Sequence, residues 1–219
     1  MTSDSPPSSV KLFFQQFVDD FFHMGAILPS SRALARAGVA YLAQKQGPVR
    51  VLEAGAGTGA FTREIVPLLQ PGDMLDLVEI NPNLIDYLQQ RFKQEAEFQM
   101  PPQVQVNFIC EDIRKIEPVT YDYIVFSLPL TNFPPAMVQE ILELMMNYLK
   151  PGGVFSYVKY IFISRLKYLF SSASVKTHMN TNQAIIKQFA DRYQITQTAV
   201  LSNVPPTWVY YWQKPESNE

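Results

Sequence analysis

The sequence predicts a single α/β domain built on a mostly parallel sheet of seven strands, and three observations support this prediction. From Val49 onward, short apolar runs alternate with stretches at helical spacing, as in consecutive βαβ units. A glycine-rich segment, from Gly55 to Gly59, directly follows the first of these runs. The last two runs have no helical stretch between them, so we expect the last strand to be antiparallel to its neighbour.

The apolar runs and the intervening periodic stretches give the order of the elements. Strands are expected near residues 49–53, 74–79, 104–109, 121–126, 153–158, 195–201 and 207–213. Helices are expected near residues 60–69, 83–98, 135–149 and 182–192. The run Pro151-Gly152-Gly153 is typical of a helix stop and turn. Together these elements define a domain over residues 47–214.

Two further helices are predicted before this domain, within residues 10–46. The segment from Val10 to His23 places Phe13 and Phe17 on an apolar face at helical spacing, opposite a polar face. Ser30-Ser31 is a suitable cap for a second helix over residues 32–44. Residues 1–9 are polar and rich in proline and serine, and are expected to be disordered.

Composition limits the classes of partner and the compartment. The chain has 219 residues, 47% of them hydrophobic, which is enough for one hydrophobic core. Its net charge of −2 gives no overall attraction to a polyanion, so a nucleic-acid partner is disfavoured. Cys110 is the only cysteine, and no segment approaches the ~20 apolar residues of a membrane span, so we expect a cytoplasmic protein. His23 and His178 lack the spacing of metal ligands, and no metal site is predicted.

One region has a different charge balance from the rest of the chain. Between Glu143 and Asp191 there is no acidic residue, while six lysines and arginines are present. Within this region, residues 159–170 are rich in aromatic and aliphatic side chains and contain Arg165 and Lys167. We therefore interpret residues 159–181 as an insertion that contacts the substrate or a membrane surface from the cytoplasmic side.

Three carboxylates stand at the ends of three successive predicted strands. Glu53 precedes the glycines, Glu79 ends the second strand, and Asp112 follows the third. Open α/β sheets bind ligands at this edge, where a carboxylate at Glu79 can accept hydrogen bonds from two ribose hydroxyls. Asp112 can accept one from an adenine amino group, with Ile80 and Ile113 on the two sides of the ring.

This set resembles class I methyltransferases that depend on S-adenosylmethionine (SAM), over about residues 49–158. The resemblance implies a Rossmann-like class I methyltransferase fold, SAM as methyl donor and S-adenosylhomocysteine as product. The segment lacks the G-x-G-x-x-G spacing that binds a pyrophosphate, and the Glu53 carboxylate suits the cationic groups of SAM. The predicted cofactor residues are Glu53, Gly55, Gly57, Gly59, Glu79, Ile80, Asp112, Ile113 and Ser127.

The segment after the fourth strand is the predicted site of transfer. Ser127, Leu128 and Pro129 begin this loop, which in the class I architecture lies beside the sulfonium of SAM. Methyl transfer is an in-line displacement that requires alignment more than acid–base groups. We assign these three residues a positioning role, and the sequence identifies no general base.

Three outer segments resemble the bacterial phospholipid N-methyltransferases that methylate phosphatidylethanolamine. They are residues 25–35, residues 127–134, and residues 203–206 with the aromatic strand that follows. The resemblance implies that residues 25–31 close over the cofactor and that the N-terminal amphipathic helix touches the bilayer. The candidate substrate or membrane contacts are Phe13, Phe17, Tyr157, Arg165 and Lys167.

Several alternatives remain open at this point. Asp19 and Asp20 lie on the polar face of the first predicted helix, where a lipid-binding helix usually has Lys or Arg. The alternative is that this helix packs on the domain. Two other acceptors are possible alternatives: a small-molecule amine and the N6 atom of an RNA adenine. The RNA alternative is weakened because Ser127-Leu128-Pro129-Leu130 lacks the aromatic fourth residue that stacks on a flipped base. A module that binds SAM or lipid without transfer is the non-enzymatic alternative.

Overall fold

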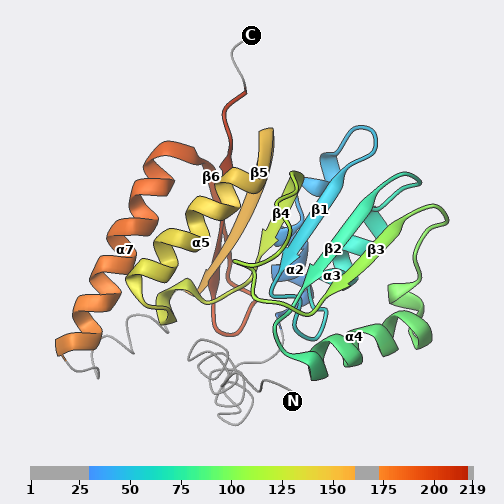
Figure 1. Cartoon of the computed structure of the whole chain (residues 1–219), viewed down its shortest axis with the longest axis horizontal. Helices are drawn as coiled ribbons and strands as arrows, with labels where there is room; N and C mark the ends of the chain where they lie inside the picture. The colour runs from blue at the N-terminus through green and yellow to red at the C-terminus, as the bar shows by residue number, and fades with distance from the viewer. Residues whose placement is uncertain (1–29, 161–172, 217–219) are drawn as a thin grey trace, which may run out of the picture.

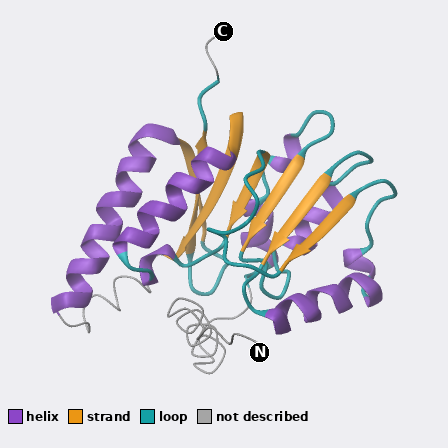
Figure 2. Ribbon diagram, in the orientation of Figure 1, coloured by secondary structure: helices purple, strands orange, loops and turns teal. Residues whose placement is uncertain are grey.

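The computed structural model describes residues 30–160 and 173–216, which form one seven-stranded sheet flanked by helices on both faces (Figures 1 and 2). The strands are β1 (Arg50–Ala54), β2 (Met74–Val78), β3 (Gln105–Ile109), β4 (Tyr121–Phe126), β5 (Leu149–Tyr160), β6 (Gln194–Val200) and β7 (Thr207–Gln213). Their order in the sheet is β3-β2-β1-β4-β5-β7-β6. Only β7 runs against its neighbours β5 and β6, so the predicted fold class is confirmed.

One helix precedes the first strand, and four others connect strands of the sheet. They are α2 (Arg32–Gly38), α3 (Thr62–Ile65), α4 (Pro82–Gln94), α5 (Pro135–Tyr148) and α7 (Ala173–Tyr193). Side chains of α5 and α7 pack with Leu52 of β1 in one apolar cluster. Side chains of α2, α3 and α4 pack with Val51 in a second cluster on the opposite face of the sheet. Successive side chains of β1 therefore point to opposite faces of the sheet and pack in two separate core layers.

Several helices differ in length from the prediction. The helix expected over residues 32–44 ends at Gly38 and is followed by a short 3₁₀ turn, Leu42–Gln44. The helix expected over residues 60–69 is α-helical only over Thr62–Ile65, because Pro67 has no backbone N–H to continue the ladder and the chain tightens into a 3₁₀ turn. The helix α7 begins at Ala173 instead of residue 182. Its first half was missed because the buried residue Asn182 is polar and interrupts the apolar periodicity that predicts a helix.

The Pro151-Gly152-Gly153 run does not form a turn between helix and strand as predicted. The strand β5 already begins at Leu149, directly after α5, and includes this run. Leu149 pairs with Tyr121 and Val154 pairs with Tyr123, so the run is an irregularity in the β5 strand. Gly152 has φ +74°, a conformation that favours glycine.

Candidate active site

The parallel strands bring four connecting segments together at the carboxyl edge of the sheet. Ala54, the last residue of β1, pairs with Val78 at the end of β2 and with Phe126 at the end of β4. Val78 in turn pairs with Ile109 at the end of β3. The glycine loop and the segments after β2, β3 and β4 therefore leave the sheet side by side, as expected for a ligand site in an open α/β sheet.

The glycine loop folds back tightly onto β2. The N–H groups of Gly55 and Ala56 both donate to the carbonyl oxygen of Val78, at 2.9 and 3.0 Å. Gly55 has φ +83°, and a Cβ atom there would lie 2.6 Å from Cδ2 of Leu128. Gly57 has φ +54°, and the nearest atom to a Cβ there would be the Gly55 oxygen at 3.9 Å. The backbone at Gly57 thus borders open space that a ligand can approach closely.

Gly59, which was predicted to bind the cofactor, is also needed for packing. A Cβ atom at this position would lie 2.6 Å from Leu88 Cδ1 and 3.0 Å from Phe98 Cε1. These side chains belong to the second apolar cluster, on the α4 side of the sheet. Gly59 therefore permits close packing of the loop against α4 and the turn after it.

The Glu79 carboxylate connects the glycine loop to the start of α4. Its Oε2 accepts a hydrogen bond from the Gly57 N–H and its Oε1 accepts one from the Asn81 N–H, both at 3.0 Å. Burial raises the pKa of Glu79, although these backbone hydrogen bonds act in the opposite direction. Because each carboxylate oxygen has about two acceptor positions, Glu79 retains capacity to accept from a ligand hydroxyl. This arrangement fits the ribose of SAM.

Glu53 is fully buried beneath the glycine loop. Its Oε2 accepts a hydrogen bond from Thr62 Oγ1 at 2.7 Å, whereas its Oε1 has no hydrogen-bond partner in the described part of the chain. Burial raises the pKa of Glu53 to about 8, and the neighbouring Glu79 charge acts in the same direction. A cationic ligand group nearby would favour the ionised carboxylate. The unpartnered oxygen therefore fits the charge of SAM.

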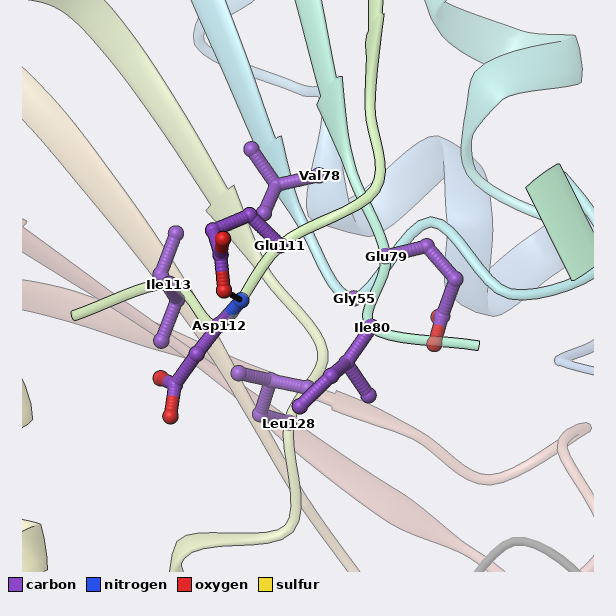
Figure 3. Close-up of a pocket in the computed structure, with 8 residues that line it drawn as sticks. All are labelled: Gly55, Val78, Glu79, Ile80, Glu111, Asp112, Ile113 and Leu128. Carbon is purple, nitrogen blue, oxygen red and sulfur yellow. Dashed lines mark hydrogen bonds between the residues drawn. The ribbon is translucent and has the colours of Figure 1, made fainter. Parts of the chain in front are cut away.

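A pocket lies at this edge, between the ends of β2 and β3 and the loop after β4 (Figure 3). It is lined by Gly55, Val78, Glu79, Ile80, Glu111, Asp112, Ile113 and Leu128. The structure thus brings the predicted Ile80, Asp112 and Ile113 together around one space. Val78 and Glu111 were missed by the sequence reasoning; the signal for both was their position next to the acidic strand ends.

Asp112 has a cationic partner that the sequence reasoning also missed. Arg114 Nη2 lies 2.6 Å from Asp112 Oδ2, and Arg114 Nη1 donates to Glu140 of α5 at 3.0 Å. Burial opposes the ionised form of Asp112, but the hydrogen bonds from Arg114 outweigh it and lower the pKa of Asp112. Arg114 therefore keeps Asp112 ionised as an acceptor and fixes the direction of its carboxylate.

The loop after β4 lies directly against the glycine loop. Ser127 Oγ donates to the Gly55 carbonyl oxygen at 2.7 Å, and the Ser127 N–H donates to the Ala54 oxygen at 3.1 Å. Leu128 packs on Gly55 and lines the pocket. Pro129 precedes a single 3₁₀ turn, Leu130–Asn132. The three residues predicted to position the acceptor are thus held beside the predicted cofactor loop.

A residue of α7 fixes the far end of this loop. Asn182 is 1% exposed, and its Nδ2 donates to the carbonyl oxygens of Phe133 at 2.8 Å and Leu130 at 3.4 Å. This contact could not be predicted from the sequence, because a lone asparagine in a polar stretch is typical of a solvated helix face.

Tyr157 is a core residue and not the acceptor contact that was predicted. It is 1% exposed and packs against Phe126 and Trp212, on the face of the sheet that α5 and α7 cover. Burial raises the pKa of its phenol. The other four candidates, Phe13, Phe17, Arg165 and Lys167, lie outside the described residues, as do residues 25–29 of the predicted cofactor lid.

Comparison with known proteins agrees with this geometry. Residues 52–155 match the family described as a methyltransferase domain. The chain is 27% identical over 149 residues to the ornithine lipid N-methyltransferase of Singulisphaera acidiphila, a match that covers 66% of this chain and 77% of that protein.

Two solved structures share the fold. A SAM-dependent methyltransferase from Methanosarcina mazei superposes with a TM-score of 0.61 at 16% identity, covering 79% of this chain and 95% of that one. The N-methyltransferase NodS from Bradyrhizobium japonicum superposes with a TM-score of 0.56 at 17% identity, covering 81% and 93%. At these identities the likeness concerns the fold.

Proposed function

We propose that this chain, which is a SAM-dependent methyltransferase, transfers methyl groups to the amine of a membrane lipid such as phosphatidylethanolamine. The observation that carries the proposal is the close packing of the loop after β4 on the glycine loop, through Leu128 and Ser127. It supports a role of this loop in acceptor binding, next to the site that we propose for the methyl donor. The similarity to a lipid N-methyltransferase supports a lipid amine as the acceptor.

The proposed donor site uses the three carboxylates in different ways. Glu79 holds the ribose, Asp112 accepts from the adenine amino group, and Glu53 offsets positive charge from beneath the glycine loop. Bound SAM supplies an electrophilic methyl group. The protein's own contribution is to fix its direction and to exclude water from the transfer path.

The acceptor amine must be neutral when it attacks, and the edge of the sheet provides a suitable environment. Desolvation favours the neutral form of an amine. Lys159, near the end of β5 at this edge, supports this proposal, because burial lowers the pKa of its amine. We propose that carbonyl groups of residues 127–134 then orient the nitrogen for in-line transfer.

The RNA alternative finds less support in the geometry. An adenine N6 acceptor would need an aromatic side chain on which the flipped base stacks. The position that corresponds to it, Leu130, is aliphatic and fully buried in the α5 cluster. A small-molecule amine remains a second candidate, because the same loop can orient any primary amine.

The proposal is tested by incubating the protein with methyl-labelled SAM and separate acceptor pools. Phosphatidylethanolamine is expected to become labelled, while phosphatidylcholine, whose nitrogen carries no proton, serves as the matched control. Parallel incubations with total RNA and with small primary amines test the alternatives. Label in one of these pools, with none in phosphatidylethanolamine or other amine-bearing lipids, would refute the lipid acceptor.

A further inference from the structure

The most exposed large apolar side chains of the described residues lie on the turn between β6 and β7, residues 201–206. Leu201 is 73% exposed and Val204 is 67% exposed, whereas the next, Tyr87 on α4, is 47% exposed. Two such side chains on one short turn present a small apolar tip to solvent. Exposed apolar groups that gather in this way are characteristic of interaction sites.

This turn lies at the same edge of the sheet as the donor pocket. Thr207, the first residue of β7, pairs with Tyr160 at the end of β5 and with Val200 at the end of β6. Tyr157 pairs with Phe126, the last residue of β4, so β5 continues about 10 Å beyond the end of β4. Figure 1 shows the turn at the edge toward which the arrows of β1, β2 and β5 point.

The hairpin that carries the turn has no charge. From Gln194 to Gln213 the sequence contains no Asp, Glu, Lys, Arg or His. The turn can therefore enter an apolar phase without desolvation of a charged group. The hairpin also has no carboxylate that would repel an anionic surface. Beside the tip, Trp208 of β7 pairs with Lys159 of β5. Trp and Lys are residue types that occur at membrane interfaces.

The conformation of the turn is fixed by an inward-facing asparagine. Asn203 is 3% exposed, and its Nδ2 donates to the Pro205 carbonyl oxygen at 2.8 Å and to Thr207 Oγ1 at 3.0 Å. Its Oδ1 accepts the Ser31 N–H at 3.0 Å, which joins the turn to the start of α2. Leu201 and Val204 thus remain outside, and little conformational freedom is lost on contact.

We propose that the β6–β7 turn contacts the lipid bilayer, with Leu201 and Val204 entering its interfacial layer. This proposal rests on the proposed lipid acceptor, since such a substrate must reach the carboxyl edge from a membrane surface. Two side chains are far too few for a protein interface, which needs about 800 Å² per partner. They suffice as one of several weak contacts with a bilayer.

The first test measures flotation of the full chain with vesicles of equal parts phosphatidylethanolamine and phosphatidylglycerol. The double variant Leu201→Ser/Val204→Ser is expected to bind these vesicles about tenfold more weakly, because it loses part of two apolar transfer free energies. Ile195→Ser is the matched control: Ile195 is 44% exposed near the start of β6, at the other end of the hairpin. It should bind as the wild type does.

A second measurement keeps the test independent of the double variant's folding. In a Cys110→Ser background, which removes the exposed native thiol, Leu201→Cys and Ile195→Cys are labelled with an environment-sensitive fluorophore. Adding the same vesicles should shift the emission of the label at 201 to shorter wavelength and leave the label at 195 unchanged.

The outcomes separate this proposal from the proposed function. Unchanged vesicle binding by the double variant, or no emission shift at 201, overturns the membrane contact. So does a dimeric wild type that the double variant converts to monomers, because the turn would then be a protein interface. Methylation of detergent-dispersed amine-bearing lipids, phosphatidylethanolamine among them, tests the proposed function separately. The double variant should retain wild-type turnover there, and a wild type inactive on all of these lipids refutes the lipid acceptor itself.

Discussion

Glu53 has a buried carboxyl group whose ionisation should affect stability. Its pKa is raised from the ordinary value of 4.5 to about 8, so the folded chain favours the protonated form. The corresponding stabilisation is fully present below about pH 4.5 and is lost as the pH rises toward 8. We expect Glu53→Gln to remove this pH dependence. The thermal midpoint of the variant minus that of wild type, both measured without SAM, should therefore increase from pH 5 to pH 8.5.

The control for this comparison is Glu64→Gln, which changes a glutamate that forms an ion pair with Arg36 near the surface. Its difference from wild type should show no comparable increase across the same pH range. A constant difference for Glu53→Gln would mean that Glu53 is already ionised in the protein without ligand.

Glu79 is the residue on which donor binding should depend most directly. Glu79→Ala removes the acceptor proposed for the ribose and leaves the Gly57 and Asn81 amides without theirs. We expect SAM and S-adenosylhomocysteine to bind more weakly by about 1.5–3 kcal/mol, the range for hydrogen bonds to charged groups. Calorimetry measures this, with Asp86→Ala on the exposed side of α4 as control. Wild-type affinity in both Glu79→Ala and Asp112→Ala would refute the donor site.

At the residue scale, the sequence predicted what depends on position along a strand. Glu79 and Asp112 could be placed at one pocket because strand ends converge at one edge of a parallel sheet. Arg114 was not, because its importance comes from reaching back to Asp112 and across to Glu140. Gly59 was placed at the ligand, although its absent side chain matters for packing on α4. Such contacts depend on side-chain direction, which spacing alone does not specify.

Among the elements, α7 is the one whose contact with the active-site loop was least predictable. Asn182→Leu keeps a side chain of similar size but removes the amide that bonds the Leu130 and Phe133 carbonyls. Because two buried acceptors lose their donor, the free energy of unfolding should fall by about 1–3 kcal/mol. We expect kcat to fall while SAM affinity is unchanged, since α7 contacts the acceptor loop and not the pocket.

The matched control for this variant is Thr181→Ala, on the exposed side of the same helix, where the hydroxyl bonds only within α7. Steady-state kinetics and thermal unfolding are measured on both variants. A loss of stability in Asn182→Leu with unchanged kcat would make Asn182 a purely structural residue.

Element ends were predicted less well than element order, and the physical reasons are local. Pro67 shortens α3 by withholding a backbone donor, and the polar Asn182 conceals the first half of α7. The Pro151-Gly152-Gly153 run is absorbed into β5 as an irregularity because neighbouring strands supply pairing on both sides of it. In each case a tertiary contact or a missing donor outweighs the periodic pattern.

For the whole molecule, the alternation of strands and helices was enough to predict the sheet, but not the order of its strands. The order β2-β1-β4 brings the glycine loop, Glu79 and Ser127 side by side, which is why the pocket proposed for the methyl donor forms here. In the part of the chain that the structure describes, no helix is long and apolar enough to cross a membrane.

Two basic residues outside the described part of the chain are expected to strengthen binding to anionic lipid. Arg165 and Lys167 lie in the stretch without acidic residues, and anionic lipids attract such residues by about 1 kcal/mol each. Arg165→Gln/Lys167→Gln should therefore weaken binding to anionic vesicles by about 2 kcal/mol, roughly 30-fold, without changing SAM affinity. Flotation at low and at physiological salt measures this. The effect should be smaller at physiological salt, where the screening length for exposed charges is about 8 Å.

Lys187→Gln is the basic control, since Lys187 already pairs with Asp191 on α7 and should contribute little attraction. Phe13→Ser/Phe17→Ser tests the apolar face of the N-terminal segment in the same assay. If that face contacts lipid, the double variant floats less at an unchanged thermal midpoint; if it packs on the domain, the midpoint falls instead. A wild-type protein that stays in the soluble fraction with anionic vesicles at low salt would remove the basis for a membrane-borne acceptor and favour a soluble amine.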